Sequence, residues 1–228
     1  MKQLAFDLAD APRPSLDNFV VARNAELVQH LREVGRSGGR ERSIYIWGLD
    51  GSGRTHLLEA AVAEFAQRGW RVRYYRAGIC PTDAAPELDA AAFDDVDRLD
   101  EPGQSTLFNL YNDLRERGGV MLAAGSTPPN QLPLRADVVT RLGWGLVYEV
   151  HALSDDEKMH ALAHRAAARG FELSLEVMRY LLTRVPRDMR TLIAMVDALD
   201  RYSLETKRAV TLTLAREMLA ERGATRVE

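Results

Sequence analysis

Residues 48–55 have the composition of a phosphate-binding loop. They read Gly-Leu-Asp-Gly-Ser-Gly-Arg-Thr, which fits GxxxxGK(S/T) except that Arg54 stands in place of lysine. Backbone N–H groups in such a loop point at phosphate oxygens, and the start of the following helix adds partial positive charge. A glycine-rich turn that binds nothing is the alternative. We predict a nucleotide site formed by Gly48, Asp50, Gly51, Ser52, Gly53, Arg54, Thr55 and His56.

The arginine at position 54 argues against fast hydrolysis by this loop alone. Lysine is a compact point charge, whereas a guanidinium group is planar, wider and forked. Arg54 can therefore hold a diphosphate, but we expect it to crowd a transferring γ-phosphate. Only three of the 30 basic residues are lysine, so a general preference for arginine is a competing explanation.

Two aspartates follow a candidate strand and suggest a metal site. Residues 88–95 read Leu-Asp-Ala-Ala-Ala-Phe-Asp-Asp, which we interpret as a strand ending in acid. Alanine is a poor strand former, so a helix or loop with surface aspartates is the alternative. At a strand end, Asp94 would hold Mg²⁺ together with Thr55. Asp95 would orient the attacking water, with a shorter reach than the glutamate common in that role.

Ser126 directly follows another candidate strand. Its hydroxyl could contact a γ-phosphate or the attacking water. It could equally be a simple turn residue before the prolines that come next, and the local sequence favours this second interpretation.

Alternating strand and helix patterns must position these residues. We predict strands at residues 43–47, 71–75, 88–95, 120–124 and 146–150. We predict one helix that ends near residue 35 and a second that runs from the phosphate loop to Gly69, and two more at 107–114 and 137–142. This alternation predicts a doubly wound α/β layer. After residue 151 we expect only helices, at 154–170, 174–186, 188–199 and 213–221. The predicted parts are a terminal peptide (1–10), a core (11–150) and a helical domain (151–228).

The amino-terminal residues 3–8 form an unusually apolar terminal peptide. Their sequence, Gln-Leu-Ala-Phe-Asp-Leu, places Leu4, Phe6 and Leu8 on one side of an extended segment. Two prolines follow and would hold the segment away from the body. It is either an edge strand of this domain or a peptide that docks into a groove on another protein. The residues alone favour neither.

Composition narrows the class of protein. The chain has 228 residues, a net charge of −3, and 28% charged and 46% hydrophobic residues, so no overall field attracts nucleic acid. The single cysteine, Cys80, excludes an internal disulfide and suggests a reducing cytoplasm; it lacks the partners of a catalytic thiol. No apolar run reaches the ~20 residues of a membrane span, and no secretory signal begins the chain.

His160 and His164 have the four-residue spacing of a metal-binding pair on a helix. Because the sequence offers no third ligand, we interpret them as a solvent-exposed helix face.

A series of motifs, in order along the chain, resembles the Hda family, the regulatory inactivators of DnaA within the AAA+ class of P-loop proteins. The motifs are residues 3–8, 48–56, 110–112, 127–129, 141–145, 153–155, 169–173 and 189–192. The resemblance implies an AAA+ core with a parallel five-stranded sheet, followed by a small all-helical lid. Arginine in the phosphate loop is itself a feature of this family.

The resemblance also implies roles for particular residues. Arg141 would be an arginine finger that enters a neighbouring protomer's site, and Arg190 a second sensor that touches the phosphates of the bound nucleotide. From the residues alone, Arg141 could instead be a surface charge and Arg190 could pair with Asp188. Ser126 falls at the first-sensor position. The terminal motif would bind the DNA polymerase sliding clamp (β subunit) through Gln3, Leu4, Phe6 and Leu8.

The implied function is negative regulation of replication initiation. A bound nucleotide, ADP in preference to ATP and with Mg²⁺ where it is held, would lock the lid against the core. The clamp tether would concentrate the protein on replicated DNA, near the replisome. Arg141 would then stimulate hydrolysis of DnaA-bound ATP in trans, by roughly 10³–10⁵-fold. Further copies of the chain could associate through the AAA+ interface.

Three other functions compete with this one. A self-sufficient P-loop ATPase, or a helicase-loader-like factor, is opposed by Arg54. A DNA-binding initiator is opposed by the slightly acidic charge and by the absence of a helix-turn-helix after the lid, so we expect no sequence-specific DNA binding. A clamp-loader subunit would carry a further collar domain.

Overall fold

Five parallel strands form the centre of the first unit of the chain, Arg13–Ala152. They are β1 (Ser43–Trp47), β2 (Val72–Arg76), β3 (Ala90–Asp94), β4 (Val120–Gly125) and β5 (Leu146–Glu149). The computed structural model describes residues 13–34, 41–76 and 87–224 and orders the strands β2-β3-β4-β1-β5. All neighbouring pairs are parallel, which confirms the predicted sheet. The carboxyl ends of the strands therefore share one edge.

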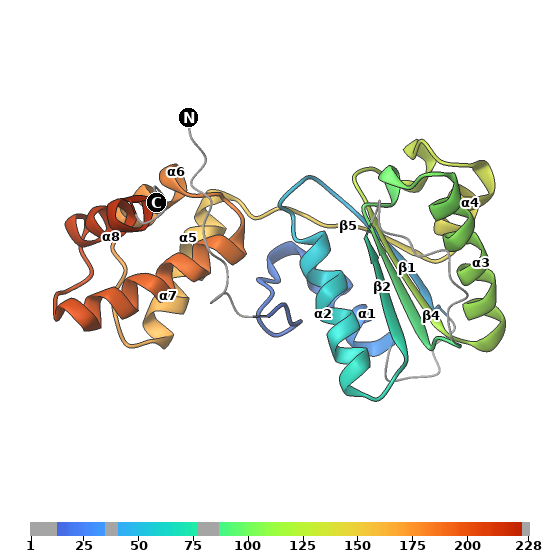
Figure 1. Cartoon of the computed structure of the whole chain (residues 1–228), viewed down its shortest axis with the longest axis horizontal. Helices are drawn as coiled ribbons and strands as arrows, with labels where there is room; N and C mark the ends of the chain where they lie inside the picture. The colour runs from blue at the N-terminus through green and yellow to red at the C-terminus, as the bar shows by residue number, and fades with distance from the viewer. Residues whose placement is uncertain (1–12, 35–40, 77–86, 225–228) are drawn as a thin grey trace. The chain divides into compact units, whose positions relative to one another are not determined.

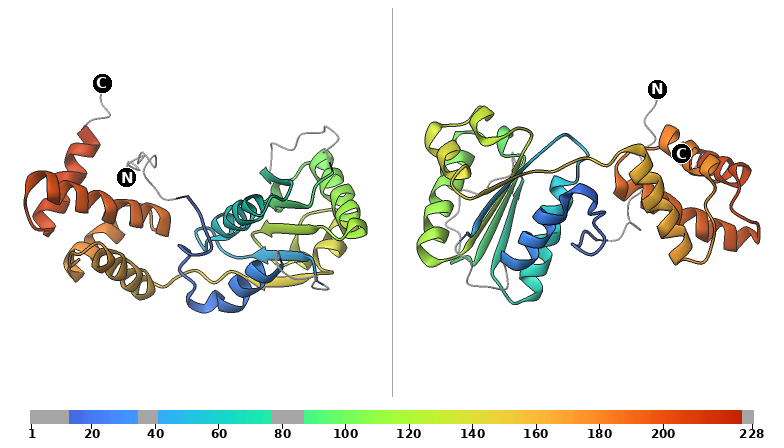
Figure 2. Two further views of the ribbon diagram at one scale, coloured as in Figure 1. Left: turned by 90° about the horizontal axis from the view of Figure 1, so that it is seen from below. Right: turned by 180° about the vertical axis from the view of Figure 1, so that it is seen from behind.

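Helices cover both faces of this sheet (Figures 1 and 2). On one face lie α1 (Ala25–Val34) and α2 (Arg54–Gln67), and on the other lie α3 (Glu101–Arg117) and α4 (Ala136–Leu142). Successive strand residues point to opposite faces. Accordingly Ile44 and Ile46 of β1 join the core under α1 and α2, whereas Tyr45 joins the core under α3 and α4. Short 3₁₀ turns lie at Ala22–Asn24, Val96–Arg98 and Pro129–Gln131.

The alanine-rich segment is a strand. All five residues of β3 are buried, and it pairs with β2 on one side and β4 on the other. A strand covered on both faces tolerates small side chains, because helices close over it and polar alternation is not required. Asp94 is its last residue and Asp95 follows it, so both aspartates lie at the carboxyl edge.

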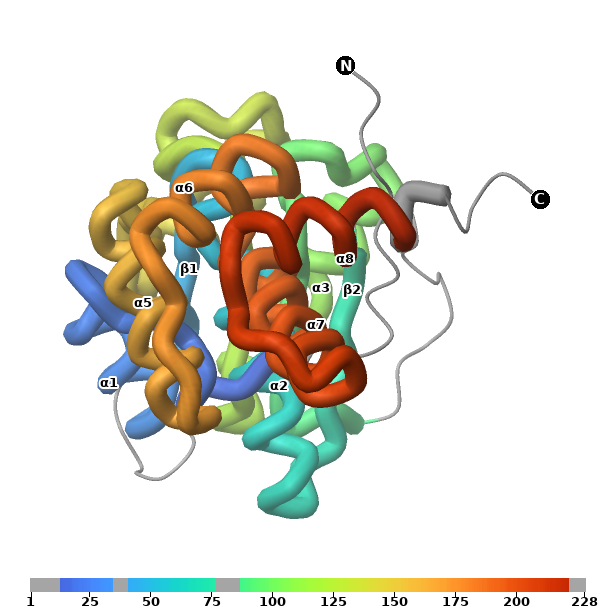
Figure 3. The backbone as a smooth tube through the Cα atoms, turned by 90° about the vertical axis from the view of Figure 1, so that its left-hand side faces the viewer, coloured from blue at the N-terminus to red at the C-terminus, as the bar shows by residue number. Residues whose placement is uncertain are grey.

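Four helices form the second described unit, which begins at Leu153. They are α5 (Asp155–Ala168), α6 (Leu175–Arg184), α7 (Met189–Thr206) and α8 (Leu212–Ala224), with no strand among the described residues of this unit. Both α5 and α8 pack against α7, as the tube in Figure 3 shows. The expected caps are present: the side chains of Ser154, Ser174 and Asp188 each accept a hydrogen bond from a backbone N–H in the first turn.

The helix α7 runs past the predicted end at Leu199, to Thr206. Most residues of α7 beyond Leu199 are polar, and several of them have partners within this unit. Asp200 accepts a hydrogen bond from Arg169 at 2.7 Å, and the Tyr202 ring packs on the helical core. Lys207, with φ of 54°, then ends the helix in a left-handed conformation.

A charge cluster joins α5 to α7. Arg165 donates two hydrogen bonds to Asp197, at 2.9 and 2.7 Å, and Arg169 lies 3.5 Å from the same carboxylate. Asp197 is buried. A bidentate arginine–carboxylate pair fixes geometry as well as charge, so it sets how these two helices cross.

The segment that leaves β5 is tied to the rest of the first unit by side chains of the first 3₁₀ turn. Asn24, buried, donates to the His151 carbonyl at 3.0 Å and accepts from the His151 N–H at 2.8 Å. Arg23 donates to the Ala152 carbonyl at 3.1 Å. The backbone is therefore held through Ala152.

The predicted terminal peptide 1–10, with Gln3, Leu4, Phe6 and Leu8, lies outside the described residues, as does Cys80. Within the described part of the chain, no helix combines the length and the apolar character needed to cross a bilayer.

Candidate nucleotide site

The loop Gly48–Thr55 connects β1 to α2 at the carboxyl edge of the sheet. Gly51 and Gly53 have φ of 77° and 105°, a region that favours glycine. A Cβ added to Gly53 would lie 2.7 Å from Phe19 Cε2, so this position also lacks space for a side chain. Within the described residues, the N–H groups of Gly53, Arg54 and Thr55 have no backbone acceptor. Free amides at a helix start are suited to phosphate oxygens.

Ser52 supplies a second indication that the loop takes a ligand. Its side chain is buried and its Oγ has no hydrogen-bond partner among the residues that the structure describes, whereas its N–H donates to the Leu49 carbonyl at 3.1 Å. Leaving a buried hydroxyl unpaired costs about 1–3 kcal/mol. A phosphate oxygen in the loop would provide the missing partner. The residues present therefore fit a nucleoside di- or triphosphate.

Arg54 is engaged by acceptors of the protein itself. Only 8% exposed, its guanidinium donates to the carbonyl of Gly125 at the end of β4 and, at 3.0 Å, to Asp50 Oδ1. Asp95 Oδ1 lies 4.0 Å away. These contacts tie the phosphate loop to the sheet edge.

Thr55 and Asp94 are hydrogen-bonded to each other, so their oxygens are close enough to share a metal ion. Thr55 Oγ1 donates to Asp94 Oδ2 at 2.7 Å, and Asp94 is 2% exposed. Hydroxyl and carboxylate oxygens are ligands that suit Mg²⁺. These two residues would hold the ion, which when bound neutralises charge on the phosphate oxygens.

Tyr74 is a member of the site that the sequence reasoning missed. Its hydroxyl donates to the same Asp94 Oδ2 at 2.6 Å, from the neighbouring strand β2. Burial, and then the hydrogen bond to Asp94, raise the pKa of the Tyr74 phenol, which therefore stays a donor at neutral pH. The backbone N–H of Asp95 donates to Asp94 Oδ1 at 3.1 Å. No local pattern in the sequence marks Tyr74, because it meets Asp94 only through strand pairing.

Asp95 and Ser126 lie at the same edge. Asp95 has φ of 51°, and burial, together with the neighbouring Asp94 carboxylate, raises the pKa of its carboxyl group. Ser126, exposed, follows β4, and its N–H donates to Asp97 Oδ1 at 3.0 Å. The sheet thus brings Thr55, Asp94, Asp95 and Ser126 to one side of the molecule.

His56 contacts the segment that precedes α1. Its Nε2 lies 3.0 Å from the Ser15 carbonyl oxygen, and its ring centroid lies 5.5 Å from that of Phe19. Because Phe19 also lies against Gly53, residues 15–19 border the phosphate loop.

Arg141, in the last turn of α4, is half-buried. Its Nε donates to Asn112 Oδ1 at 3.1 Å, and its Nη1 donates to the Asp137 carbonyl at 3.2 Å. The Phe108 ring lies against the guanidinium, with 3.9 Å between Cζ of Arg141 and the ring centroid. Within the described residues it forms no ion pair. By contrast, Arg135 at the start of the same helix lies 2.7 Å from Asp137.

Arg190 is exposed in the first turn of α7. The alternative pairing with Asp188 is not formed, because Asp188 instead accepts the Thr191 N–H at 2.8 Å. In the described residues Arg190 has no ion pair. His160 and His164 are exposed on α5, and no group of three potential metal ligands occurs in the described part of the chain.

Known proteins share this architecture. Residues 155–219 match the family described as "Hda, lid domain". AMPPCP-bound DnaA from Aquifex aeolicus is 25% identical with a TM-score of 0.68, over 85% of this chain and 67% of that one. The chain is therefore similar to DnaA-related AAA+ proteins, and its residues 155–219 match an Hda-type lid. The resemblance found in the sequence is thereby confirmed, and these likenesses support a DnaA-related replication regulator.

Two further structures share the AAA+ fold. Domain III of DnaA from Thermotoga maritima is 22% identical, with a TM-score of 0.70 over 92% of this chain and 97% of that domain. A RuvB variant from the same organism is 15% identical, with a TM-score of 0.64 over 92% of this chain and 72% of that one. The predicted AAA+ core with a helical lid is confirmed.

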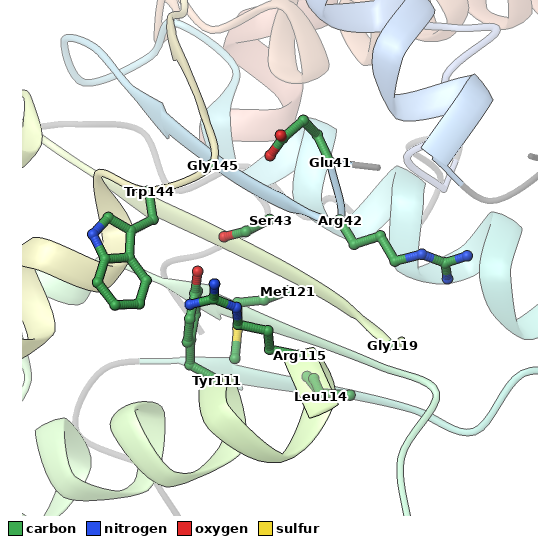
Figure 4. A pocket seen from close by; sticks show the side chains of 10 residues that line it. All are labelled: Glu41, Arg42, Ser43, Tyr111, Leu114, Arg115, Gly119, Met121, Trp144 and Gly145. Carbon is green, nitrogen blue, oxygen red and sulfur yellow. The ribbon is translucent and has the colours of Figure 1, made fainter. Parts of the chain in front are cut away.

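A cavity of about 250 Å³ in this AAA+ protein lies away from the phosphate loop (Figure 4). Ser43 and Met121, which line it, are at the amino ends of β1 and β4, the edge opposite the loop. Trp144, which is 53% exposed, forms one wall, and the Arg115 Cζ lies 4.8 Å from the centroid of its ring. Arg42 and Arg115 line this cavity, whereas the phosphate loop offers backbone amides at a helix start.

Proposed function

We propose that this chain is a negative regulator of chromosomal replication initiation that acts on DnaA. It would bind an adenine nucleotide of its own, dock on the DNA polymerase sliding clamp, and stimulate hydrolysis of DnaA-bound ATP in trans through Arg141. Two observations support adenine nucleotide binding: the fit of the Gly48–Thr55 loop to phosphates, and the bound AMPPCP in the similar DnaA structure.

The observation that carries the proposal is the state of Arg141. An arginine finger has to deliver a full positive charge to the γ-phosphate of another molecule. Arg141 is charged, partly accessible and held by neutral groups, with no ion pair within the described residues. An arginine that only contributes charge to the protein surface would not need neutral side-chain and backbone contacts that hold its guanidinium.

Arg54 supports a structural role for the chain's own nucleotide. Its guanidinium donates to Gly125 and Asp50, so part of its donor capacity is committed to the protein at the position from which lysine normally reaches the β- and γ-phosphates. A bound diphosphate needs less charge stabilisation from that cation than a triphosphate does in the transition state of hydrolysis. ADP, with Mg²⁺ on Thr55 and Asp94 where the ion is held, is therefore the nucleotide we propose.

The terminal peptide would supply the tether to the clamp. Its apolar residues Leu4, Phe6 and Leu8 have the period of a peptide that inserts alternate side chains into a groove. The prolines that follow would act as a stiff spacer. Arg190 would contact the phosphates of the chain's own nucleotide, and copies of the chain could associate through the AAA+ interface.

The test follows phosphate release from ATP-bound DnaA mixed with DNA-loaded clamp and this protein. We expect fast release with the native chain, and loss of stimulation with Arg141→Ala or with a variant that lacks residues 1–8. Arg117→Ala is the matched control, because Arg117 is an exposed arginine with only a loose 3.9 Å pair to Asp113. Equal release by all four proteins would refute action in trans through Arg141.

One observation favours a second candidate, a self-sufficient ATPase. Thr55 and Asp94 lie within hydrogen-bond distance of each other, where both could hold the Mg²⁺ of a magnesium-dependent hydrolase. That function requires steady turnover by the isolated chain at an ordinary enzymatic rate of about 1 s⁻¹ or more. Phosphate release from the purified protein with MgATP alone decides between the two.

A further inference from the structure

The cavity at the amino edge of the sheet has the residues of a second ligand site. Three parts of the first unit line it: Ser43 at the start of β1, Tyr111 and Arg115 on α3, and Trp144 after α4. Gly145 allows the chain beside Trp144 to approach β1, because a Cβ added to Gly145 would lie 2.7 Å from the Ser43 carbonyl carbon. The backbone that carries the tryptophan is therefore fixed against the sheet.

Tyr111 brings a polar group without a partner to this cavity. Its side chain is 5% exposed, and its hydroxyl forms no hydrogen bond with any residue that the structure describes. By contrast, the buried Tyr45 hydroxyl donates to the Thr127 carbonyl at 2.7 Å. Figure 4 shows the Tyr111 hydroxyl directed toward the same space as the Ser43 hydroxyl and the Arg115 guanidinium. Because the O–H of a buried tyrosine normally has a partner, a ligand in this space would supply the missing one.

Arg115 adds a positive charge that is not neutralised by an ion pair within the described part of the chain. Its Cζ lies 4.8 Å from the centroid of the Trp144 ring. Stacking on a ring uses the flat face of a guanidinium and leaves the N–H groups at its edges available. Those edges bind a carboxylate through two parallel hydrogen bonds. Arg115 is therefore suited to hold a carboxylate beside the indole.

The charge and shape of the lining define the class of ligand. Two arginines, Arg42 and Arg115, and one acidic residue, Glu41, give the lining a net charge of +1. Arg42 is directed away from the cavity in Figure 4, which leaves Arg115 as the cation that faces it. A single positive charge suits a singly charged anion. The half-exposed indole of Trp144 favours a planar ring, which can pack against it.

We propose that this cavity binds a small aromatic carboxylate. Arg115 and the Tyr111 hydroxyl hold the carboxylate group, and the ring lies against Trp144. The volume of about 250 Å³ accommodates a molecule of one or two rings, below the usual range of drug-sized sites. This site is separate from the phosphate loop, and the proposal does not depend on the proposed function.

The experiment titrates the full chain with 2-naphthoate and follows binding by ligand-observed NMR. Excess ADP is present throughout, so that any nucleotide site at the phosphate loop is filled. Two further probes separate the contributions: 2-naphthamide keeps the rings without the charge, and acetate keeps the charge without the rings. We expect a Kd on the order of 1 mM or tighter for 2-naphthoate, and binding at least ~10-fold weaker for the other two.

Three variants test the residues. Tyr111→Phe keeps the ring and removes the hydroxyl, so it should weaken 2-naphthoate binding about 10-fold, as expected for a lost hydrogen bond to a charged group. Arg115→Ala should weaken it at least ~10-fold. Arg117→Ala is the matched control on the same helix and should bind like the native chain, because Arg117 does not line the cavity. The Tm of each variant should stay close to native.

Three results would overturn the proposal: no detectable binding of 2-naphthoate, equal binding of 2-naphthoate and 2-naphthamide, or native affinity in both Tyr111→Phe and Arg115→Ala. AMP is the last probe, because a mononucleotide also carries a ring and an anion. If AMP binds as tightly as 2-naphthoate in the presence of ADP, and loses affinity in Arg115→Ala, the assignment to carboxylates is wrong.

Discussion

Replacing Arg54 with lysine would restore the usual residue of a phosphate-binding loop, yet we expect it to destabilise the nucleotide-free protein. The guanidinium reaches the Gly125 carbonyl and the Asp50 carboxylate with two different nitrogens. A lysine nitrogen ends near the position of the guanidinium carbon and falls short of both acceptors. The Gly125 carbonyl would then lose a charged donor inside the protein.

The bond to Gly125 dominates the expected loss. Hydrogen bonds to charged groups contribute about 1.5–3 kcal/mol, and this one is buried. The Asp50 side chain is 91% exposed, so its pair with Arg54 is of the surface kind, which contributes about 0–1 kcal/mol. We therefore expect Arg54→Lys to lower the free energy of unfolding by about 1.5–3 kcal/mol, and Asp50→Asn to lower it by less than about 1 kcal/mol.

Urea unfolding followed by tryptophan fluorescence is a suitable assay. The three tryptophans, Trp47, Trp70 and Trp144, all belong to the unit Arg13–Ala152, so the signal reports on the sheet that Arg54 stabilises. Both variants should be compared with the native chain without nucleotide. An unchanged midpoint for Arg54→Lys would refute the reasoning, as would a loss for Asp50→Asn that is equally large.

Three more predictions concern stability. Asp95→Asn should raise the Tm at pH 7.5, because burial and Asp94 raise the pKa of this carboxyl and so disfavour its ionised form in the fold; the gain should shrink as the pH falls below the ordinary aspartate pKa, where native and unfolded chains both keep the proton, and a gain independent of pH would contradict this. Tyr74→Phe removes a hydrogen-bond donor to Asp94 and should lower the free energy of unfolding by about 1.5–3 kcal/mol in the same fluorescence assay. A native midpoint would show that the hydrogen bond from Thr55 alone is enough to stabilise the buried Asp94 carboxylate. Asp197→Asn weakens the bidentate pair with Arg165, so thermal unfolding followed by circular dichroism should lose the helical unit at lower temperature while tryptophan fluorescence is unchanged; a shift of both signals together would refute independent packing of that unit.

The elements were predictable because their signals are local. The strand β1 is a short β-rich run directly before the phosphate loop, Gly118 ends α3 in a left-handed conformation, and Ser154 with Glu157 forms a capping box. Even β3 was predictable, despite its alanines, because acidic residues follow it. The end of α7 was not, because the helix continues through polar residues whose partners, such as Arg169 and Glu221, lie elsewhere in the sequence.

The partners of the site residues could not be predicted, because they depend on tertiary packing. Arg54 meets Gly125 across 71 residues, Tyr74 meets Asp94 across 20, and Arg141 meets Asn112 across 29. Each contact depends on strand order or on which helix face turns toward a neighbour. Motif spacing identified Arg54, Asp94 and Arg141 as candidates but carried no information on what holds them.

The side-chain anchors on His151 and Ala152 leave very little chain free between the two units. Asn24 and Arg23 hold the backbone through Ala152, and the Ser154 N–H is already bonded to Glu157 Oε2 at 2.7 Å. Only Leu153 lies between these two fixed ends. Any rotation of one unit against the other along this connection must therefore come from the few backbone dihedral angles near Leu153. A nucleotide would need to bias only those few torsions to transmit its presence from one unit to the other.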